Sequence, residues 1–332
     1  MKAQLLGLGL LGLSGLGAGA AHGGDEPRLQ WPVRCVVGVS CVVQHYVDQD
    51  PGPGIRDFAC GTTTYQDHSG IDIRLRTERQ QAAGVDVLSA AAGRVLRVRD
   101  GVVDMSVRER GAAAVKGEEC GNGLVIDHGQ GLQTQYCHMR RGSLKVKPGD
   151  QVSALQPLGQ VGLSGNTEFP HLHFTVRQGG KVVDPFNGGA VGSACGGGAS
   201  MWDPGLRAGL AYKASTVLNR GFTADTPTIA RVEAGDLEDV RVGADTPMIV
   251  FVRATGLKQG DSLSLTLTGP GGETLAASTP LVLDRNKAQQ FMFVGRKARA
   301  GGWPAGVYTA LYRVERAGAV ALSDEFRQEI RR

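Results

Sequence analysis

Several features that mark common protein classes are scarce in this sequence of 332 residues. Lys and Arg exceed Asp and Glu by only four, and no basic run is longer than a pair. A protein that binds nucleic acid by neutralising phosphates needs a more basic surface, so we exclude a nucleic-acid partner. Beyond the N-terminal region no run is apolar enough to span a bilayer, and we expect no stable membrane insertion of the mature chain.

Two common metal-binding motifs are also missing. The six cysteines include no Cys-x-x-Cys pair, which argues against a structural zinc site. The sequence has no His-Glu-x-x-His, so the helical arrangement of many zinc peptidases is excluded. Residues 222–332 contain neither histidine nor cysteine and therefore offer no imidazole nitrogen or cysteine sulfur as a metal ligand.

Glycine, in contrast, is abundant, with 50 of the 332 positions. It separates short segments in which apolar and polar residues alternate, a pattern typical of β-strands joined by tight turns. With 41% apolar residues the chain can bury a core, and we expect an all-β protein. Two strand-rich regions, 60–186 and 222–332, indicate two domains, and the strand spacing of the second predicts an immunoglobulin-like β-sandwich.

The N-terminus has the three parts of a secretory signal peptide. Lys2 is followed by an apolar run of about 12 residues and then by small residues that end at Ala20. We expect residues 1–20 to be removed, with an uncleaved membrane anchor as the alternative. The mature protein would then be periplasmic or extracellular, where an even number of cysteines indicates disulfide bonds.

One disulfide pair can be assigned from the pattern. Residues 127–131 (DHGQG) lie between two strand-like runs and predict a hairpin turn. Cys120 and Cys137 lie at similar distances on either side of this turn, so cross-strand positions would bring them within bonding reach. We predict a Cys120–Cys137 disulfide that holds His138 against the sheet. The pairing of the others stays open: Cys35, Cys41, Cys60 and Cys195.

Three groups of histidines carry candidate chemistry. His68 and Asp72 are four positions apart and His171 and His173 are two apart, spacings that place both side chains on one face of an extended strand. His138 ends an alternating run. Two imidazoles and a carboxylate can hold catalytic zinc and leave a fourth position for water. The candidate ligands are His68, Asp72 and one of His171 and His173, and the remaining histidines would transfer protons or stabilise charge.

Each of these features also has a structural interpretation. A single His-x-x-x-Asp is common in loops, and a His-x-His can lie on the protein surface without binding a metal. Their occurrence together with His138 in one secreted domain favours a metal site. His45 belongs to no motif and we interpret it as structural. His128 lies in the predicted turn and is interpreted as exposed or turn-stabilising, whereas His22 lies in the cleavage region and indicates nothing.

Short motifs in a fixed order resemble those of a known family. They are His68-x-x-x-Asp72 and the segments 121–129 (GNGLVIDHG), 135–139 (QYCHM), 147–152 (KPGDQV), 162–166 (GLSGN) and 170–174 (PHLHF). Over about residues 58–186 the chain thereby resembles the lysostaphin-like (LytM-type) zinc metallopeptidases, which cut peptide bonds in bacterial peptidoglycan.

The resemblance implies a compact, mainly antiparallel β domain with the site in a groove on one sheet. It implies that His68, Asp72 and His173 bind one Zn²⁺ and that His138 and His171 are catalytic residues that do not bind the metal. It also implies peptidoglycan as substrate without identifying the cleaved bond. The family includes degenerate members that lack zinc ligands and activate other wall hydrolases. A non-catalytic wall-binding or hydrolase-activating protein is therefore the alternative, and the complete ligand set argues against it.

A few positions differ from the usual family pattern. Phe169 and Pro170 stand where a small residue and a glycine are usual, which predicts a different groove wall. Thr175 stands where a glutamate commonly follows, and Cys137 replaces a small residue.

These inferences give an order of domains along the chain. We expect a signal peptide at 1–20, an N-terminal extension at 21–57, a zinc metallopeptidase domain at 58–190, a linker at 191–221 and a β-sandwich accessory domain at 222–332. The accessory domain would position the enzyme on the wall or on a wall-associated protein partner, or cover the groove.

Overall fold

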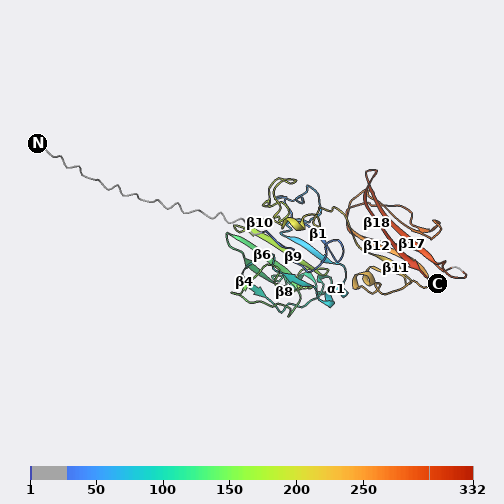
Figure 1. Cartoon of the computed structure of the whole chain (residues 1–332), viewed down its shortest axis with the longest axis horizontal. Helices are drawn as coiled ribbons and strands as arrows, with labels where there is room; N and C mark the ends of the chain where they lie inside the picture. The colour runs from blue at the N-terminus through green and yellow to red at the C-terminus, as the bar shows by residue number, and fades with distance from the viewer. Residues whose placement is uncertain (2–27, 299, 332) are drawn as a thin grey trace.

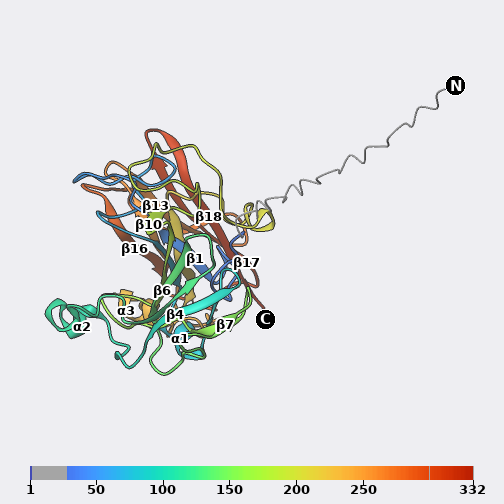
Figure 2. The same cartoon turned by 90° about the vertical axis from the view of Figure 1, so that its left-hand side faces the viewer.

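The computed structural model describes residue 1, residues 28–298 and residues 300–331 (Figures 1 and 2). Apart from Met1, the expected signal peptide lies outside the described residues, as does His22. The architecture is mostly β, as expected, and no described helix has both the length and the apolar character needed to cross a membrane. The helices are short: α1 Glu78–Ala83, α2 Val107–Arg110, α3 Ile229–Ala234, and the 3₁₀ turns η1 Ala112–Val115 and η2 Pro204–Leu206.

An antiparallel sheet of eight strands organises the first unit (Figure 1). Its order is β1-β2-β9-β6-β5-β4-β7, and β10 also pairs with β9. The strands are β1 Cys41–His45, β2 Ile71–Leu75, β4 Gly93–Arg99, β5 Asn122–Asp127, β6 Leu132–Met139, β7 Gln151–Val152, β9 His171–Gln178 and β10 Lys181–Val183. A separate pair is formed by β3 Asp86–Leu88 and β8 Pro157–Gln160.

The predicted hairpin is confirmed as the connection between β5 and β6. The His128 amide donates a hydrogen bond to the Leu132 carbonyl oxygen at 2.9 Å and closes the turn. Gly129 and Gly131 have φ values of 85° and 80°, a region that glycine enters without steric cost.

Three disulfides occur among the described residues. Cys120 and Cys137 are bonded as predicted, with their Cα atoms 4.8 Å apart, and the bond lies beside the β5–β6 hairpin. The pairs that the sequence left open are Cys35–Cys41 and Cys60–Cys195.

Strand β2 is buried at all five positions because both of its faces are covered. Ile71 and Ile73 belong to the hydrophobic core of the first unit, which also contains Trp202 from far along the chain. Asp72 and Arg74 alternate with them and point to the other face. The apolar residues of this strand therefore anchor a row of buried polar side chains.

The second unit contains two antiparallel sheets that share one hydrophobic core. One sheet has the order β11-β12-β16 and the other the order β14-β13-β17-β18, with β15 paired to β13. The strands are β11 Thr216–Thr223, β12 Met248–Leu257, β13 Ser262–Thr268, β14 Thr274–Ala277, β15 Leu281–Val282, β16 Lys287–Arg296, β17 Gly306–Arg316 and β18 Ala319–Ile330. A boundary between 221 and 222 falls inside β11.

The stretch expected as a linker, 191–221, packs against the first unit over part of its length. Trp202 is 1% exposed and, like Leu210, belongs to the core of that unit. Cys195 is bonded to Cys60, so the glycine-rich segment that follows it is attached to the first unit at its start.

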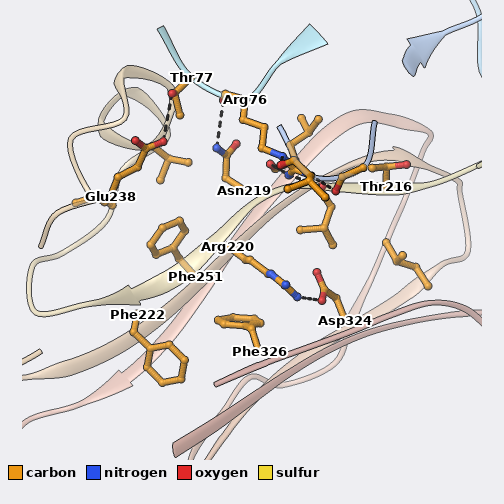
Figure 3. Close-up of a pocket in the computed structure, with 18 of the residues that line it drawn as sticks. Arg76, Thr77, Thr216, Asn219, Arg220, Phe222, Glu238, Phe251, Asp324 and Phe326 are labelled. Atoms are coloured by element: carbon orange, nitrogen blue, oxygen red, sulfur yellow. Dashed lines mark hydrogen bonds and ion pairs between the residues drawn. The ribbon is translucent and has the colours of Figure 1, made fainter. Parts of the chain in front are cut away.

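Arg76, which follows β2, joins the two units (Figure 3). Its Nε and Nη2 donate hydrogen bonds to the carbonyl oxygens of Val39 at 2.5 Å and Gly38 at 2.6 Å. Its Nη1 donates to the carbonyl oxygens of Val217 at 3.0 Å and Leu218. A cavity of about 990 Å³ adjoins these contacts, and none of the described histidines lines it.

Candidate metal centre

Strand pairing brings together candidate residues that are 101 positions apart in the sequence. β2 pairs with β9 so that Asp72 lies opposite His173 and Arg74 lies opposite His171. Residues directly opposite each other in a sheet face the same side, and so do residues two apart on one strand. The expected same-face placement of His171 and His173 is thereby confirmed, and His68 joins them from the loop before β2.

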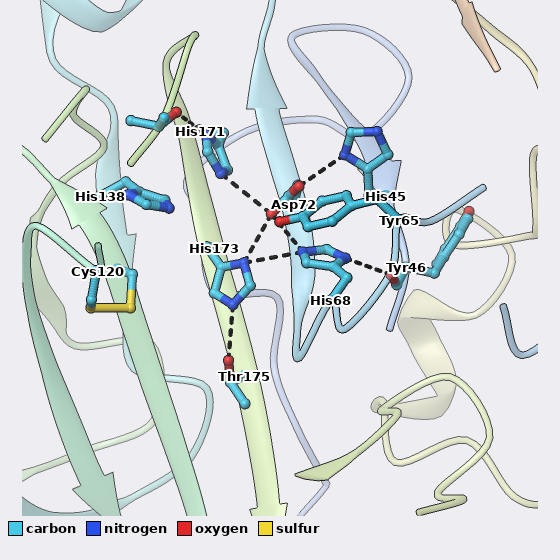
Figure 4. A network of polar contacts seen from close by, with 12 residues as sticks. His45, Tyr46, Tyr65, His68, Asp72, Cys120, His138, His171, His173 and Thr175 are labelled. Carbon is cyan, nitrogen blue, oxygen red and sulfur yellow. Dashed lines mark hydrogen bonds and ion pairs between the residues drawn. A yellow bond between two sulfur atoms is a disulfide. The ribbon is translucent and has the colours of Figure 1, made fainter. Parts of the chain in front are cut away.

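Three donor atoms form a compact triangle on this face (Figure 4). His68 Nε2 lies 3.1 Å from Asp72 Oδ1 and 3.2 Å from His173 Nδ1, and the latter two atoms are 3.0 Å apart. His68 and Asp72 are each 2% exposed, whereas the His173 side chain is 13% exposed. The triangle is therefore largely buried, and His173 is its most exposed member.

This triangle fits the tetrahedral arrangement in which proteins hold zinc. Donors at about 2.0–2.1 Å from one ion, at tetrahedral angles, are separated by about 3.3 Å. The three observed separations, 3.0–3.2 Å, are close to that value. Two imidazole nitrogens and one carboxylate oxygen are also donor types that suit zinc, and three protein ligands leave a fourth position.

Neighbouring groups fix the orientation of both imidazoles of the triangle. His68 Nδ1 lies 2.6 Å from the Tyr46 carbonyl oxygen, to which it donates, so the lone pair of Nε2 is directed at the triangle. His173 Nε2 lies 3.1 Å from Thr175 Oγ1, which leaves Nδ1 as the nitrogen that faces the triangle. Ligand histidines commonly hold their second nitrogen in this way.

His45 takes part in the centre, although no motif marks it. Its Nδ1 lies 2.9 Å from Asp72 Oδ2, the carboxylate oxygen that does not belong to the triangle. The interpretation of His45 as structural therefore understates its position, because it holds a candidate ligand. Tyr46 and Thr175 were likewise not recognised as partners of the site, although the unusual threonine was noted. The pairing of β1 with β2, which places His45 opposite Asp72, leaves no local signal in the sequence.

His138 and His171 lie side by side next to the triangle, with ring centroids 4.6 Å apart. His138 Nδ1 donates to the Ser164 carbonyl oxygen at 2.8 Å. His171 Nδ1 lies 3.0 Å from both Thr167 Oγ1 and the Phe169 carbonyl oxygen. Both Nε2 atoms are therefore left for other partners, and that of His171 is 3.3 Å from Asp72 Oδ1.

Backbone geometry also places His138. Its φ of 61° lies in the left-handed region, which is uncommon for residues other than glycine. The His138 amide donates to the Cys120 carbonyl oxygen at 2.8 Å, and Cys137 is bonded to Cys120. The disulfide thus secures the segment that presents His138.

A second set of three donors shares His173 with the first. His138, His171 and His173 have ligand atoms within 4.8 Å of one another, as have His68, Asp72 and His173. Geometry alone allows either set to hold a metal, and only the set with Asp72 includes a carboxylate.

The charges within the cluster are strongly coupled. Burial raises the pKa of Asp72, but His68 and His171 outweigh this and bring the pKa well below its usual value, so the carboxylate is ionised. Burial lowers the pKa of His68, yet the attraction of Asp72 leaves it above the usual value. Burial is the main cause that brings the pKa of His138 well below its usual value, and the positive charges of the neighbouring His171 and His173 lower it further. His138 is therefore neutral at physiological pH.

His128 lies apart from this cluster. Its Nδ1 donates to the Ala92 carbonyl oxygen at 2.8 Å and its Nε2 lies 2.7 Å from Thr134 Oγ1. These contacts agree with the interpretation that it stabilises the turn.

The part of the chain that contains the site is similar to a known peptidase family. Residues 66–185 match the family model described as Peptidase family M23. Over these residues, about a third of its length, the chain is similar to the lysostaphin-like M23 family.

Curated relatives match over part of the chain. One is an uncharacterized metalloprotease of Buchnera aphidicola, 32% identical over 123 residues, which are 36% of this chain and 26% of the relative. The DD-carboxypeptidase/endopeptidase Mpg of Neisseria meningitidis is 29% identical over 102 residues, 31% of this chain and 21% of the relative. The murein hydrolase activator EnvC of Escherichia coli is 39% identical over 62 residues, 19% of this chain and 14% of the relative. The matches span about a quarter or less of the length of these relatives.

A solved structure is similar over a comparable share of the chain. The catalytic domain of lysostaphin from Staphylococcus simulans shows 20% identity and a TM-score of 0.27, covering 42% of this chain and 85% of that chain.

Proposed function

We propose that the protein is a zinc-dependent endopeptidase that hydrolyses peptide bonds in bacterial peptidoglycan. The observation that supports this most strongly is the triangle of donor atoms on His68, Asp72 and His173, whose sides of 3.0–3.2 Å suit one tetrahedral ion. The family match and the names of the relatives, which include an endopeptidase, support the reaction type.

In this proposal His68, Asp72 and His173 hold the metal through Nε2, Oδ1 and Nδ1. Bound zinc supplies a Lewis acid that activates a water molecule and polarises the scissile carbonyl group. Asp72 keeps its negative charge because its pKa is low, and His45 holds its second oxygen. Tyr46 fixes the tautomer of His68, so the donor nitrogen is available without rearrangement.

His138 and His171 would carry the proton transfers. The Ser164 and Phe169 carbonyl oxygens hold their Nδ1 atoms, so each presents Nε2 to the reacting groups. One of the two, neutral, accepts the proton of the attacking water at Nε2 and passes it to the leaving amine. The other, protonated on both ring nitrogens, donates a hydrogen bond from Nε2 to the developing oxyanion. The depressed pKa of His138 supports a neutral imidazole able to accept that proton.

The test combines metal content with hydrolysis of purified peptidoglycan by the full chain. Wild-type protein should contain one zinc and release muropeptides whose masses identify the cleaved bond. His173→Ala should lose both properties. His128→Ala, which alters a histidine of the distant hairpin, is the matched control and should keep both. Full zinc occupancy and activity in His173→Ala would exclude the proposed ligand set.

A second candidate function is activation of another wall hydrolase without catalysis. It is favoured by the similarity to the murein hydrolase activator of Escherichia coli. The complete donor triangle argues against it. A zinc-free protein that leaves purified peptidoglycan intact but accelerates a separate hydrolase would support this function and exclude the first.

The location and the C-terminal unit complete the proposal. The signal-like N-terminus and the three disulfides support a periplasmic or extracellular protein. The two sheets around one core, in a unit of about the commonest domain size, support an immunoglobulin-like β-sandwich. In our proposal this sandwich holds the enzyme on peptidoglycan or on a wall-associated protein.

A further inference from the structure

A buried arginine beside the metal centre contacts both units of the protein. Arg74 follows Asp72 on the same face of β2 and is 3% exposed. Its Nη1 donates to Gln44 Oε1 at 2.6 Å, and its Nη2 lies 3.6 Å from Glu233 Oε1. Its guanidinium carbon lies 3.9 Å from the centre of the Phe169 ring, within the range of a cation–π contact.

Phe169 connects this arginine with His171. The Phe169 and His171 rings have centroids 4.9 Å apart. The Phe169 carbonyl oxygen lies 3.0 Å from His171 Nδ1 and, together with Thr167 Oγ1 at the same distance, orients the ring. Any displacement of Phe169 therefore moves both the ring and the acceptor against which His171 is placed.

Glu233 is the carboxylate that keeps Arg74 in this position. It belongs to α3 of the second unit, and its Oε1 also pairs with Nη1 of Arg253, which is 1% exposed. Burial and the nearby Arg253 lower the pKa of Arg74 to about 9, and Glu233 opposes this shift. Two buried guanidinium groups that share one carboxylate repel each other when it is neutralised. Arg74 would then move away from its place against Phe169.

We propose that Glu233 is a positioning residue for His171, acting across the unit boundary through Arg74 and Phe169. The C-terminal unit thereby sets part of the catalytic geometry, whether or not it also binds the wall. This inference rests on the proposed function in assigning His171 a catalytic role. The replacement of a small residue by Phe169, noted in the sequence, gains a physical reason: the aromatic ring is what Arg74 contacts.

The kinetic test uses Glu233→Gln in the full, zinc-loaded chain with a soluble muropeptide. A misplaced catalytic group costs turnover more than binding, so we expect kcat to fall about 10-fold with KM within about twofold. Zinc content should not change, because none of the three ligands contacts Glu233. Assays are run well below the melting temperature of each variant.

Asp239→Asn is the matched control. Asp239 pairs with Arg79 at 2.5 Å between the same two units, with no contact to Arg74. Its kcat should equal that of the wild type. An equal loss of kcat in both variants, or a lowered melting temperature with unchanged kcat in Glu233→Gln, would mean that Glu233 only stabilises the contact between units, and the proposal would be wrong.

A double-mutant cycle tests the route through the aromatic ring. Phe169→Leu, which changes a partly exposed residue, should lower kcat by a similar factor. In that background Glu233→Gln should cause little further loss, because the pathway is already broken. If the loss of kcat in the double variant equals the product of the two single losses, the two residues act independently and the proposed route is wrong. If Glu233→Gln fails to fold, Phe169→Leu alone decides: an unchanged kcat contradicts the proposal.

A spectroscopic readout separates this inference from the proposed function. In protein with ¹³C-labelled histidine rings, the His171 signal is identified by its loss in His171→Ala. Glu233→Gln and Phe169→Leu should both shift that signal, and Asp239→Asn should not. An unshifted signal in Glu233→Gln overturns the positioning role. A shifted signal in a protein that cleaves no peptidoglycan would retain the positioning of His171 and refute the proposed function.

Discussion

His45 Nδ1 lies 2.9 Å from Oδ2 of Asp72, so the last residue of β1 holds the carboxylate whose other oxygen belongs to the donor triangle (Figure 4). This contact fixes the rotation of the carboxylate and directs Oδ1 toward His68 and His173. His45 lies outside residues 66–185, the part of the chain that matches the family model.

The first prediction concerns His45. Replacing it by Ala should weaken zinc binding about 10- to 100-fold, the usual cost of losing a group that orients a metal ligand. Competition with a fluorescent zinc chelator measures the affinity. His128→Ala should leave it unchanged, and an unaltered affinity in His45→Ala would show that Asp72 needs no such support.

The second prediction separates the two overlapping sets of donors. His68→Ala should lose zinc, because His68 belongs only to the set with Asp72. His138→Ala should keep zinc and lose about 10²–10⁴-fold in rate, the typical contribution of a proton-transfer group. Zinc content and muropeptide turnover are measured on the same samples. The opposite pattern, zinc lost in His138→Ala and retained in His68→Ala, would assign the metal to the three histidines.

The third prediction concerns the disulfide beside His138. Replacing Cys120 and Cys137 together by Ser should lower the free energy of unfolding by about 3 kcal/mol, the chain-entropy value for a closed loop of this length. The two residues are 17 positions apart. Denaturant titration gives the free energy, and the rate should fall as well because the segment that presents His138 is released.

The Cys35–Cys41 pair provides a comparison for that experiment. Its residues are six positions apart, so the same relation predicts a smaller loss of about 2 kcal/mol when both are replaced by Ser. That variant should retain zinc and most of its rate. Equal loss of rate in both variants would mean that the Cys120–Cys137 bond has no particular connection with His138.

The fourth prediction concerns pH and Asp184, a buried residue with a carboxylate oxygen that lacks a hydrogen-bond partner among the described residues. Burial raises the pKa of Asp184 to about 7. Its pKa is therefore higher in the folded than in the unfolded chain, and the folded chain binds the extra proton. The contribution to stability is present at low pH and is lost as the pH rises toward 7.

Asp184→Asn removes this dependence. In Asp184→Asn the change in unfolding free energy between pH 5 and pH 8 should be smaller than the same change in the wild type, by about 2–3 kcal/mol. Denaturant titrations at the two pH values give the difference. Asp225→Asn, at an exposed ion pair, should leave it unchanged. A wild-type pH dependence in Asp184→Asn would place the titrating group elsewhere.

Local periodicity was sufficient to predict part of the site. The two-residue period of a strand placed His171 and His173 on one face, and the glycine-rich turn at 127–131 located the hairpin and with it the Cys120–Cys137 bond. These features depend on neighbours in sequence and on the regular alternation of side chains.

The features of the site and fold that the sequence did not predict depend on contacts between segments far apart in the chain. His45 reaches Asp72 only because β1 pairs with β2, with an irregular register between Val43 and His45. Glu233 and Arg74 come from different units and neither stands in a motif. The burial of Trp202 in the first core likewise follows from tertiary packing, which a glycine-rich composition around residues 196–200 does not disclose.

The Cys60–Cys195 bond closes a covalent ring around almost the whole metal centre. His68, Asp72, His138, His171 and His173 all lie between the two bonded cysteines, which are 135 positions apart. A protease that cuts the chain once at any point between them therefore cannot separate these five residues into two molecules. A chain cut once in this way would remain one particle, with these residues still tethered to one another.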